Sequence, residues 1–529
     1  MPTMQYMPDL EEGQVLKFSI EPAEAGAKVV SVPRAVANGD VTVRASAAVG
    51  TTLAALGDNG SYTTNGWDTV YAVALPDVNS AIVKQKSSPT SWSAHIPAGG
   101  FTPKIDATGA FTDWQLTTGG SGSIVRMHVP FSADVTVGDT TNYDVQGGVA
   151  YVEVKLKYIP QPPVADTTPN DLKVRDSGGS PDDPVVTVSS VTYTSPSPAV
   201  DGLAGALLNL LEQWMNANLQ DFQHVFATVD IATEEATGDF AWLAPTSTSY
   251  AYLDNDDINY ALLGILSMTE NRSPEEAVQS IGADAIPTNA RASFNLSLER
   301  VMSKMILPAL PLEFTHAPAG TFTLSGDATQ IVAGQSFDLD QVKVGAINYT
   351  PNVTNFSIAF VNGELQTSIQ VHTPISPGID AYFSGTYYTT MSLATKSDGT
   401  QSLTWNQAQN PVTNSWYTVA NWITITEAIV SLILAVAGAV VGGVATSVTN
   451  TVVKVLIAVL VGGVVGAIVF VLTQIPNWIA GSVPEQAPSV SGLTDGATKP
   501  QKWADSTEFQ ITTAVLNGGM QLGGSPFGS

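Results

Sequence analysis

The chain has 529 residues, of which 47 are Asp or Glu and 21 are Lys or Arg, so its formal net charge is −26. This negative surplus argues against a nucleic-acid partner and against docking of basic residues onto anionic headgroups. Hydrophobic residues make up 44% of the chain and charged residues 13%, which excludes general disorder, while the absence of cysteine excludes disulfides and thiolate chemistry.

The N-terminal segment, residues 1–60, combines short β-prone runs with turn signals. Asn38-Gly39 between alternating apolar residues is typical of a hairpin, so we predict a β-rich extension. The first residues, MPTMQYMPDLEEGQVLKF, lack the basic stretch and apolar run of a secretory signal. A cytoplasmic location is therefore the default expectation, and release by lysis or by non-classical export would leave no mark in the sequence.

The segment TNGWDTVYAVALPDVNSAIVKQ predicts a strand followed by a helix. Pro76-Asp77 interrupts the strand and suits the first turn of a helix, because Pro needs no amide donor there and Asp favours the positive end. One face of the strand carries Trp67, Thr69, Tyr71, Val73 and Leu75.

Further on, VAYVEVKLKYI alternates apolar and charged residues, which predicts a half-exposed antiparallel strand. Its inward residues are Val152, Val154, Leu156 and Tyr158. The segment 160–184 is rich in Pro, Gly and Asp and therefore predicts a long loop or a domain boundary.

Two helices are expected in the middle of the chain. The first, DGLAGALLNLLEQWMNANLQ, has an apolar stripe opposite polar residues, and the strand HVFATVDI follows it. The stripe is Leu203, Leu207, Leu210, Leu211 and Trp214, with Asn209, Glu212, Gln213 and Asn216 opposite. The second helix, NLSLERVMSKMILPALP, should end at Pro308 and Pro311.

Residues 320–405 predict antiparallel hairpins that turn at Asn362-Gly363 and Asp398-Gly399. The tail EFQITTAVLNGGMQLGG returns to β character. Between these two regions the chain is almost uncharged, because only Glu427 and Lys454 occur between Asp398 and Glu485.

This uncharged region contains two apolar runs, 428–448 and 452–475, on either side of the polar segment TSVTNT. We interpret them as a helical hairpin with arms of about 30 Å. A helix that is apolar all round must be buried in protein or in lipid. Three interpretations remain: core helices or the wall of a lipid cavity, a hairpin that inserts conditionally into a bilayer, and a constitutive span.

We favour the core or cavity wall, because the flanks lack the Lys and Arg clusters that orient membrane spans. Membrane contact stays open, but a span is not predicted. The candidates for lipid contact on the inner surfaces of the hairpin are Val436, Val440, Ile457, Val464 and Ile468.

A search for chemistry gives no catalytic residue, metal ligand or cofactor site. The five histidines are far apart and form no metal-binding pair, and no G-x-S-x-G motif occurs. The acidic segment LDNDDINY lacks the glycine and the distal glutamate of a calcium loop, so a solvated turn or a helix cap is the better interpretation. The glycines of TTGGSGSIV do not match a phosphate-binding loop and predict a turn.

Several long blocks, in the same order, resemble the forty-seven-kilodalton protein family encoded beside clostridial neurotoxins. The similarity spans residues 62–525, so residues 1–60 are an extension. The blocks are TNGWDTVYAVALPDVNSAI, LLNLLEQWMNANLQDFQHVFATVDI, FAWLAPTSTSYAYLDNDDINYALLGILSMTENR, SFNLSLERVMSKMILPALP and TTAVLNGGMQLGGSP.

The resemblance implies an α+β fold of the tubular lipid-binding (TULIP) superfamily, in which twisted antiparallel sheets wrap around long helices. It also implies a non-catalytic lipid-binding or toxin-accessory protein. Two alternatives are a membrane-inserting toxin subunit that uses residues 427–475 and an assembly protein that binds a co-encoded toxin. The expected regions are 1–60 (extension), 61–200 and 201–420 (two TULIP-like regions), 421–480 (apolar hairpin) and 481–529 (tail).

Overall fold

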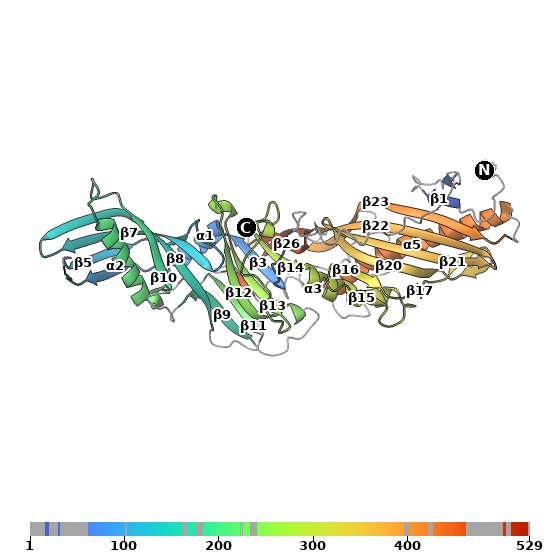
Figure 1. Ribbon diagram of the computed structural model, residues 1–529, viewed down its shortest axis with the longest axis horizontal. Coiled ribbons are helices and arrows are strands. Elements are labelled where there is room, and N and C mark those ends of the chain that lie inside the picture. Colours follow the sequence, from blue (N-terminus) through green and yellow to red (C-terminus); the bar gives the residue numbers. More distant parts are fainter. Residues whose placement is uncertain are drawn as a thin grey trace. The chain divides into compact units, whose positions relative to one another are not determined.

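The computed structural model divides into two compact units (Figure 1). Unit 1 contains residues 1–61, 298–489 and 516–518, and unit 2 contains residues 62–297, 490–515 and 519–529. The residues that the structure describes are 16–20, 30–31, 62–100, 103–160, 167–175, 184–222, 224, 226–232, 241–395, 401–421, 427–461, 501–503 and 509–526. The predicted turn at Asn38-Gly39 lies outside these residues.

Unit 1 is built on a nine-stranded antiparallel sheet in the order β15-β16-β20-β21-β22-β23-β1-β2, with β17 also paired to β20. The strands are β15 (Phe322–Leu324), β16 (Gln330–Ala333), β17 (Phe337–Asp338), β20 (Asn352–Val361), β21 (Glu364–Ser376), β22 (Ile379–Thr395), β23 (Gln401–Val419), β1 (Leu16–Ile20) and β2 (Val30–Ser31). A separate two-stranded sheet pairs β18 (Val342–Val344) with β19 (Ile347–Tyr349).

The predicted hairpins of this unit are found. Asn362 and Gly363 have φ angles of 53° and 81° and join β20 to β21. Two positive φ angles in succession define a tight hairpin turn that Asn and Gly adopt most readily. Asp398-Gly399 lies outside the described residues, although Thr395 and Gln401 on either side of it pair as expected.

One long helix, α5 (Glu427–Val461, 35 residues), packs on the sheet of unit 1 (Figure 1). The predicted helical hairpin is wrong at its bend, because residues 446–451 lie inside α5. The segment TSVTNT contains neither Gly nor Pro, and Ser and Thr side chains can bond to the carbonyl one turn back while the helix continues. The second arm beyond Val461 lies outside the described residues. Among the helices of the described part of the chain, none qualifies as a membrane-span candidate.

The second predicted helix forms, but it does not end at its prolines. After β14, the helical turns are α3 (Leu298–Arg300), a π-helical segment (η6, Val301–Ile306), η7 (Leu307–Ala309) and α4 (Leu310–Glu313). The amide of Leu307 bonds to the carbonyl of Met302, five residues back, immediately before Pro308. Pro lacks an amide donor, and the change of helical type at η6 and η7 accommodates it without ending the helix.

Unit 2 contains a nine-stranded sheet in the order β24-β11-β9-β8-β7-β5-β4, with β10 paired to β8 and β6 to β7. The strands are β24 (Gln501–Trp503), β11 (Ala227–Ala232), β9 (Thr167–Val174), β8 (Thr141–Pro160), β7 (Ile124–Val137), β5 (Ile105–Phe111), β4 (Ser91–Ile96), β10 (Val186–Thr192) and β6 (Gln115–Leu116). The loop predicted for 160–184 therefore contains a strand, because β9 pairs with both β8 and β11.

The predicted alternation in β8 is confirmed. Val152, Val154 and Leu156 are buried and Tyr158 is partly buried, whereas Lys157 is exposed. Helix α2 (Leu203–Ala217) packs on this sheet and buries its predicted stripe together with Met215 (Figure 1).

A six-stranded sheet completes unit 2 in the order β12-β13-β3-β14-β26-β25. The strands are β12 (Pro245–Leu253), β13 (Leu262–Thr269), β3 (Thr69–Ala74), β14 (Ala292–Ser297), β26 (Gly519–Ser525) and β25 (Gln510–Leu516). Every residue of the central strand β3 is buried, so both of its faces lie in the core. Helix α1 (Leu75–Gln85) follows β3, with Pro76 and Asp77 in its first turn as predicted. Short 3-10 turns are η2 (Leu219–Asp221), η3 (Ala241–Leu243), η4 (Ile258–Tyr260) and η5 (Ala283–Ala285).

Candidate functional site

The candidate site is the core of unit 1 beside α5. This helix contacts β21, β22 and β23 of the sheet and also the helical turns of residues 301–313. Its sequence is apolar on all sides, but burial distinguishes one face. The buried residues are Val430, Ile433, Val436, Ala437, Val440, Val444 and Val448. Ala428, Ser431, Ala435, Gly442 and Gly443 are exposed.

Two of the five residues predicted to contact lipid lie on this buried face. Val436 is 0% exposed and Val440 is 3% exposed. Ile457 lies in α5, but its side chain is not among those described, and Val464 and Ile468 lie outside the described residues. The structure thus brings Val436 and Val440 to one helix face, and their contact with a lipid stays a prediction.

The inner face of the sheet carries buried polar atoms that have no hydrogen-bond partner within the described part of the chain. They are Thr367 Oγ1 on β21, Tyr387 Oη on β22, and Trp405 Nε1 and Ser415 Oγ on β23. Thr367 and Tyr387 are direct register partners across β21 and β22. A buried polar group without a partner destabilises a protein by about 1–3 kcal/mol, so each such atom requires an explanation such as bound water or a ligand.

Gly385 lies between two aromatic rings on this inner face. A Cβ at this position would be 2.8 Å from a ring atom of Phe383 and 2.8 Å from one of Tyr387. Both rings therefore extend over the Gly385 backbone, which only a residue without a side chain allows. Burial raises the pKa of Tyr387 above its ordinary value, so its hydroxyl stays protonated and can both donate and accept a hydrogen bond.

The sequence search did not find these polar positions. Strict alternation in IDAYFSGTYYTTMSLAT places Phe383, Gly385 and Tyr387 on one face and could have identified the inward residues of β22. No sequence signal shows that the Tyr387 hydroxyl lacks a partner, because that depends on the strands beside it and on α5.

The five histidines do not assemble into a site. His95 contacts Asp106 at 2.6 Å, His316 contacts Asp340 at 3.0 Å, and His372 contacts Asp380 at 2.8 Å. The residues that the structure describes contain no cluster of metal-binding side chains.

One residue of the acidic segment after β12 caps a helical turn, which is one of the two outcomes expected for it. Asp257 accepts a hydrogen bond from the amide of Asn259 at the start of η4. Asp254 accepts one from the amide of Gly119, which lies in the glycine-rich segment before β7. The glycine-rich turn thus binds a side chain of the protein itself at this position.

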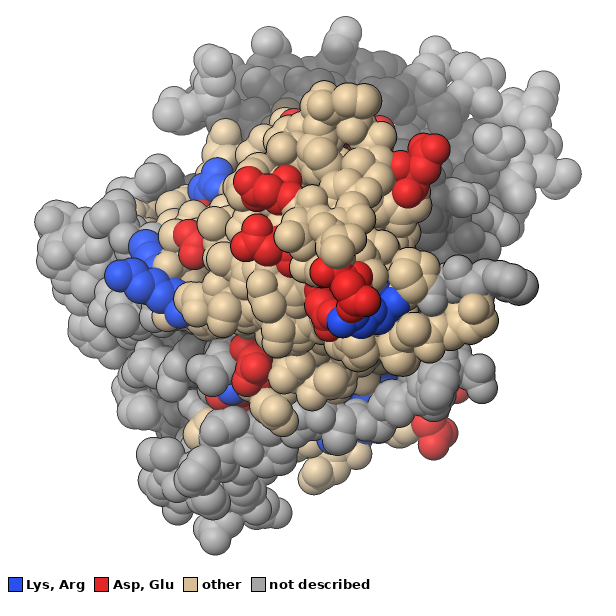
Figure 2. Space-filling view, turned by 90° about the vertical axis from the view of Figure 1, so that its left-hand side faces the viewer, with Lys and Arg blue, Asp and Glu red and all other residues tan. Residues whose placement is uncertain are grey.

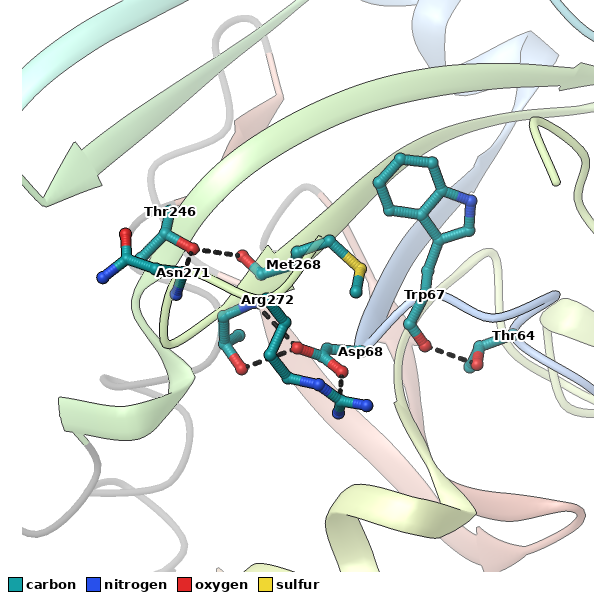
Figure 3. Close-up of polar contacts among 8 residues, drawn as sticks. Thr64, Trp67, Asp68, Thr246, Met268, Asn271 and Arg272 are labelled. Carbon is teal, nitrogen blue, oxygen red and sulfur yellow. Dashed lines mark hydrogen bonds and ion pairs between the residues drawn. The ribbon is translucent and has the colours of Figure 1, made fainter. Parts of the chain in front are cut away.

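A polar junction at the start of β3 joins two of the sequence blocks that carry the family resemblance (Figure 3). The buried carboxylate of Asp68 accepts hydrogen bonds from the amide and the hydroxyl of Thr269 at 2.8 and 2.9 Å and contacts Arg272 at 2.6 Å. Arg272 follows a tight turn in which Glu270 and Asn271 have φ angles of 51° and 58°. Because all these partners are part of the protein, we interpret the junction as a set of contacts that stabilises the fold of unit 2.

The face in Figure 2 shows acidic side chains scattered among uncharged ones. Basic side chains are fewer there and lie mostly near the edges of the coloured surface. Acidic side chains therefore predominate on the described part of that face.

The fold is therefore of the mostly-β α+β class. Each of the two units is built on antiparallel sheets, and in unit 1 a long helix packs its apolar face on the sheet. Comparison with known proteins is consistent with this class. A family model described as OrfX-like, Protein OrfX2/OrfX3/P47, matches residues 64–524, so the chain belongs to this family, which is associated with botulinum neurotoxin gene clusters. Residues 1–63 precede the matched region.

Two curated relatives are similar, one over nearly its whole length and the other over three quarters of its length. The chain is 28% identical to Protein OrfX3 of Paraclostridium bifermentans over 495 residues, covering 87% of this chain and 98% of the relative. It is 22% identical to Protein P47 of Clostridium botulinum (strain Kyoto / Type A2) over 326 residues, covering 61% and 75%. The structure of P47 from Clostridium botulinum A2 matches with a TM-score of 0.61 at 18% identity, covering 88% of this chain and 99% of P47, which shows a shared fold.

Proposed function

We propose that this protein is a non-catalytic, TULIP-like accessory protein of a bacterial toxin gene cluster, and that it binds a lipid or fatty acid in the core of unit 1. The observation that supports the proposal is the group of buried, unpartnered polar atoms on the sheet that packs against α5. An acyl chain requires an apolar wall, which Val436 and Val440 supply. Its carboxyl or ester end requires hydrogen-bond partners inside that wall, which Thr367, Tyr387 and Ser415 supply.

The first test is purification without detergent, extraction with organic solvent and mass spectrometry of the extract. We expect a lipid or fatty acid in stoichiometric amount. Delipidated protein should then take up a fluorescent fatty acid or a fluorescent phospholipid. Absence of lipid in repeated extractions, together with no uptake of either probe, would contradict the proposal.

A matched pair of variants locates the site. Tyr387→Phe removes only the buried hydroxyl, and Tyr388→Phe removes the same group from the next residue, which lies on the opposite face of β22. We expect Tyr387→Phe to weaken uptake of the fatty acid by about fivefold or more, the size expected for one lost hydrogen bond, and Tyr388→Phe to leave it unchanged. Equal effects of the two variants would place the lipid elsewhere.

Two other functions receive less support. Insertion into a bilayer, the alternative based on a helical hairpin over 427–475, has less support because the segment expected to form the bend is helical. The buried face of α5 also packs against the unit 1 sheet, so insertion would have to break this contact. Binding of a co-encoded toxin stays a prediction, with no specific surface in its favour.

A further inference from the structure

The outer face of the unit 1 sheet, opposite α5, carries a row of three aromatic rings on neighbouring strands. His372 on β21 pairs in register with Tyr382 on β22, and Tyr382 pairs with Trp416 on β23. The His372 and Tyr382 rings have centroids 5.0 Å apart and planes 29° apart. The Tyr382 and Trp416 rings have centroids 5.4 Å apart and planes only 6° apart.

The three rings are partly open to solvent. Their strand neighbours on both sides, such as Phe383 and Tyr417, are buried, whereas His372, Tyr382 and Trp416 are half-buried. Parallel rings in direct face contact would be about 3.5 Å apart, so centroids 5.4 Å apart mean that the rings are offset. An offset stack leaves part of each ring face uncovered.

A second row on the same face runs beside the rings and consists of uncharged polar residues. Gln370 on β21 pairs in register with Ser384 on β22, and Ser384 pairs with Asn414 on β23. Each lies two residues from one of the rings, at a spacing of about 7 Å along the strand. Within the described part of the chain, the side chains of Gln370, Ser384 and Asn414 form no hydrogen bond with other residues.

The outward side of β22 is less charged than the protein as a whole. The outward residues of β22 from Tyr382 to Ser392 include no acidic or basic side chain, in a chain whose net charge is −26. Two charged residues border the two rows: Asp380 is paired with His372, and Lys17 on β1 is the register partner of Trp416. A polar surface with one acidic and one basic residue at its border suits a neutral ligand better than a strongly charged one, because a charged ligand would lose hydration for little gain in ion pairing.

We propose that this platform, formed by His372, Tyr382, Trp416, Gln370, Ser384 and Asn414, binds a neutral oligosaccharide. The C–H face of a sugar ring packs on the uncovered aromatic faces, while its hydroxyls bond to the amide and hydroxyl groups of the second row. Two rows across three strands about 4.8 Å apart match the size of one or two sugar rings. Cross-strand aromatic pairs also stabilise sheets, so the test must separate binding from stability.

The test uses the full chain, fluorescently labelled, on an array of immobilised neutral and sialylated glycans, followed by calorimetric titration with the best neutral glycan. We expect retention on neutral glycans, and a loss of affinity of at least about tenfold in Trp416→Ala. Tyr388→Ala is the matched control, because it removes an aromatic ring from the same face of β22 outside the platform, and its affinity should not change.

Thermal unfolding shows whether Trp416→Ala keeps its fold. If it does not, the double variant Gln370→Ala with Asn414→Ala removes the polar row without changing a ring, and it should weaken binding by the same order. No retention on any neutral glycan, retention only on sialylated glycans, or affinity unchanged in these variants would overturn the proposal. Fatty-acid uptake should be normal in all of them, so this proposal and the lipid proposal can fail separately.

Discussion

Helices α2 and α5 each cover a sheet, but they are attached to it in different ways. The polar side of α2 is bonded to the free edge of β10. Asn216 accepts from the amide of Val186 at 3.2 Å and donates to its carbonyl at 2.7 Å, and Glu212 accepts from the amide of Val188 at 2.8 Å. These directional bonds fix α2 in position and protect an edge strand from other pairing partners.

Helix α5, in contrast, presents small and branched apolar side chains such as Val436, Ala437 and Val440 to its sheet. Apolar packing is not directional, so such a helix tolerates a change in what lies beside it more readily than one bonded through side chains. Helix α2 is therefore a fixed cover, whereas the less directional packing beneath α5 is better suited to admit a ligand.

The unpartnered polar atoms of the two cores also differ in kind. In unit 2, Trp114 Nε1 and His224 Nε2 belong to an aromatic cluster, and the Trp114 ring meets the Phe111 and Phe222 rings edge to face at 5.2 and 4.9 Å. Aromatic faces can accept weak hydrogen bonds from such groups. In unit 1, the four atoms described above are three hydroxyl oxygens and one indole nitrogen on β21 to β23, and a polar ligand or water would satisfy them.

The largest expected effect concerns the polar junction around Asp68 in unit 2. Asp68→Ala should lower the free energy of unfolding by about 3–5 kcal/mol, because Arg272 and the Thr269 amide lose a buried partner. Asp77→Ala is the matched control, since Asp77 also pairs with an arginine, Arg291, whose side chain is 54% exposed, and its loss should be about 1 kcal/mol or less. Urea unfolding measures both, and equal losses in the free energy of unfolding would show that Asp68 stabilises the protein no more than an exposed ion pair does.

A pH effect comes next and tests the aromatic cluster of unit 2. Burial lowers the pKa of His224 from 6.5 to about 4. As pH falls through this interval, the unfolded chain takes up a proton before the folded protein does, so stability present above pH 6.5 is lost towards pH 4. The loss is about 3 kcal/mol. Urea unfolding at several pH values should show that the free energy of unfolding depends less on pH in His224→Leu than in the wild type. An equal pH dependence in both proteins would contradict the assignment to His224.

A smaller effect tests the attachment of α2. Asn216→Ala should lower the free energy of unfolding by about 1–3 kcal/mol, because the amide and carbonyl of Val186 lose their partner. Asn209→Ala on the exposed side of the same helix should change it by no more than about 0.5 kcal/mol. The same loss in both variants would mean that the bonds to β10 do not fix the helix.

The smallest expected effect is a change in stability whose sign depends on whether fatty acid is bound in the core of unit 1. Thr367→Val keeps the shape of the side chain and removes an unpartnered buried hydroxyl, so delipidated protein should gain about 1 kcal/mol in stability. Protein loaded with fatty acid should lose part of the stabilisation that the ligand gives. Thermal unfolding with and without fatty acid measures both, and the same shift in the two states would argue against a ligand at Thr367.

Much of the fold follows from local patterns in the sequence. The stripe of α2, the alternation in β8, the turn at Asn362-Gly363 and the Pro76-Asp77 helix start are each determined by neighbouring residues, and each was found as predicted. β9 was missed because Pro and Asp dominate its surroundings, and its pairing with β8 and β11 outweighs them.

The candidate site was less accessible to sequence reasoning. An all-apolar helix gives little sign of which face is buried, so packing was needed to show that the face with Val436 and Val440, two of the five residues named from the sequence, is buried. TSVTNT was predicted as a bend because it is polar, although polarity does not end a helix. The polar atoms of Thr367 and Tyr387 are defined by the absence of partners within the described structure, which depends on the whole unit.

The most direct test of the central claim uses a lipid that quenches tryptophan fluorescence on contact. Delipidated protein is titrated with dibromostearic acid, and the quenching in wild type is compared with that in Trp405→Phe and Trp114→Phe. We predict that the quenching is mostly lost in Trp405→Phe, whose indole lies on the inner face of β23, and is retained in Trp114→Phe, whose indole lies in the aromatic cluster of unit 2. Quenching that is unchanged in Trp405→Phe would contradict a lipid site in the core of unit 1.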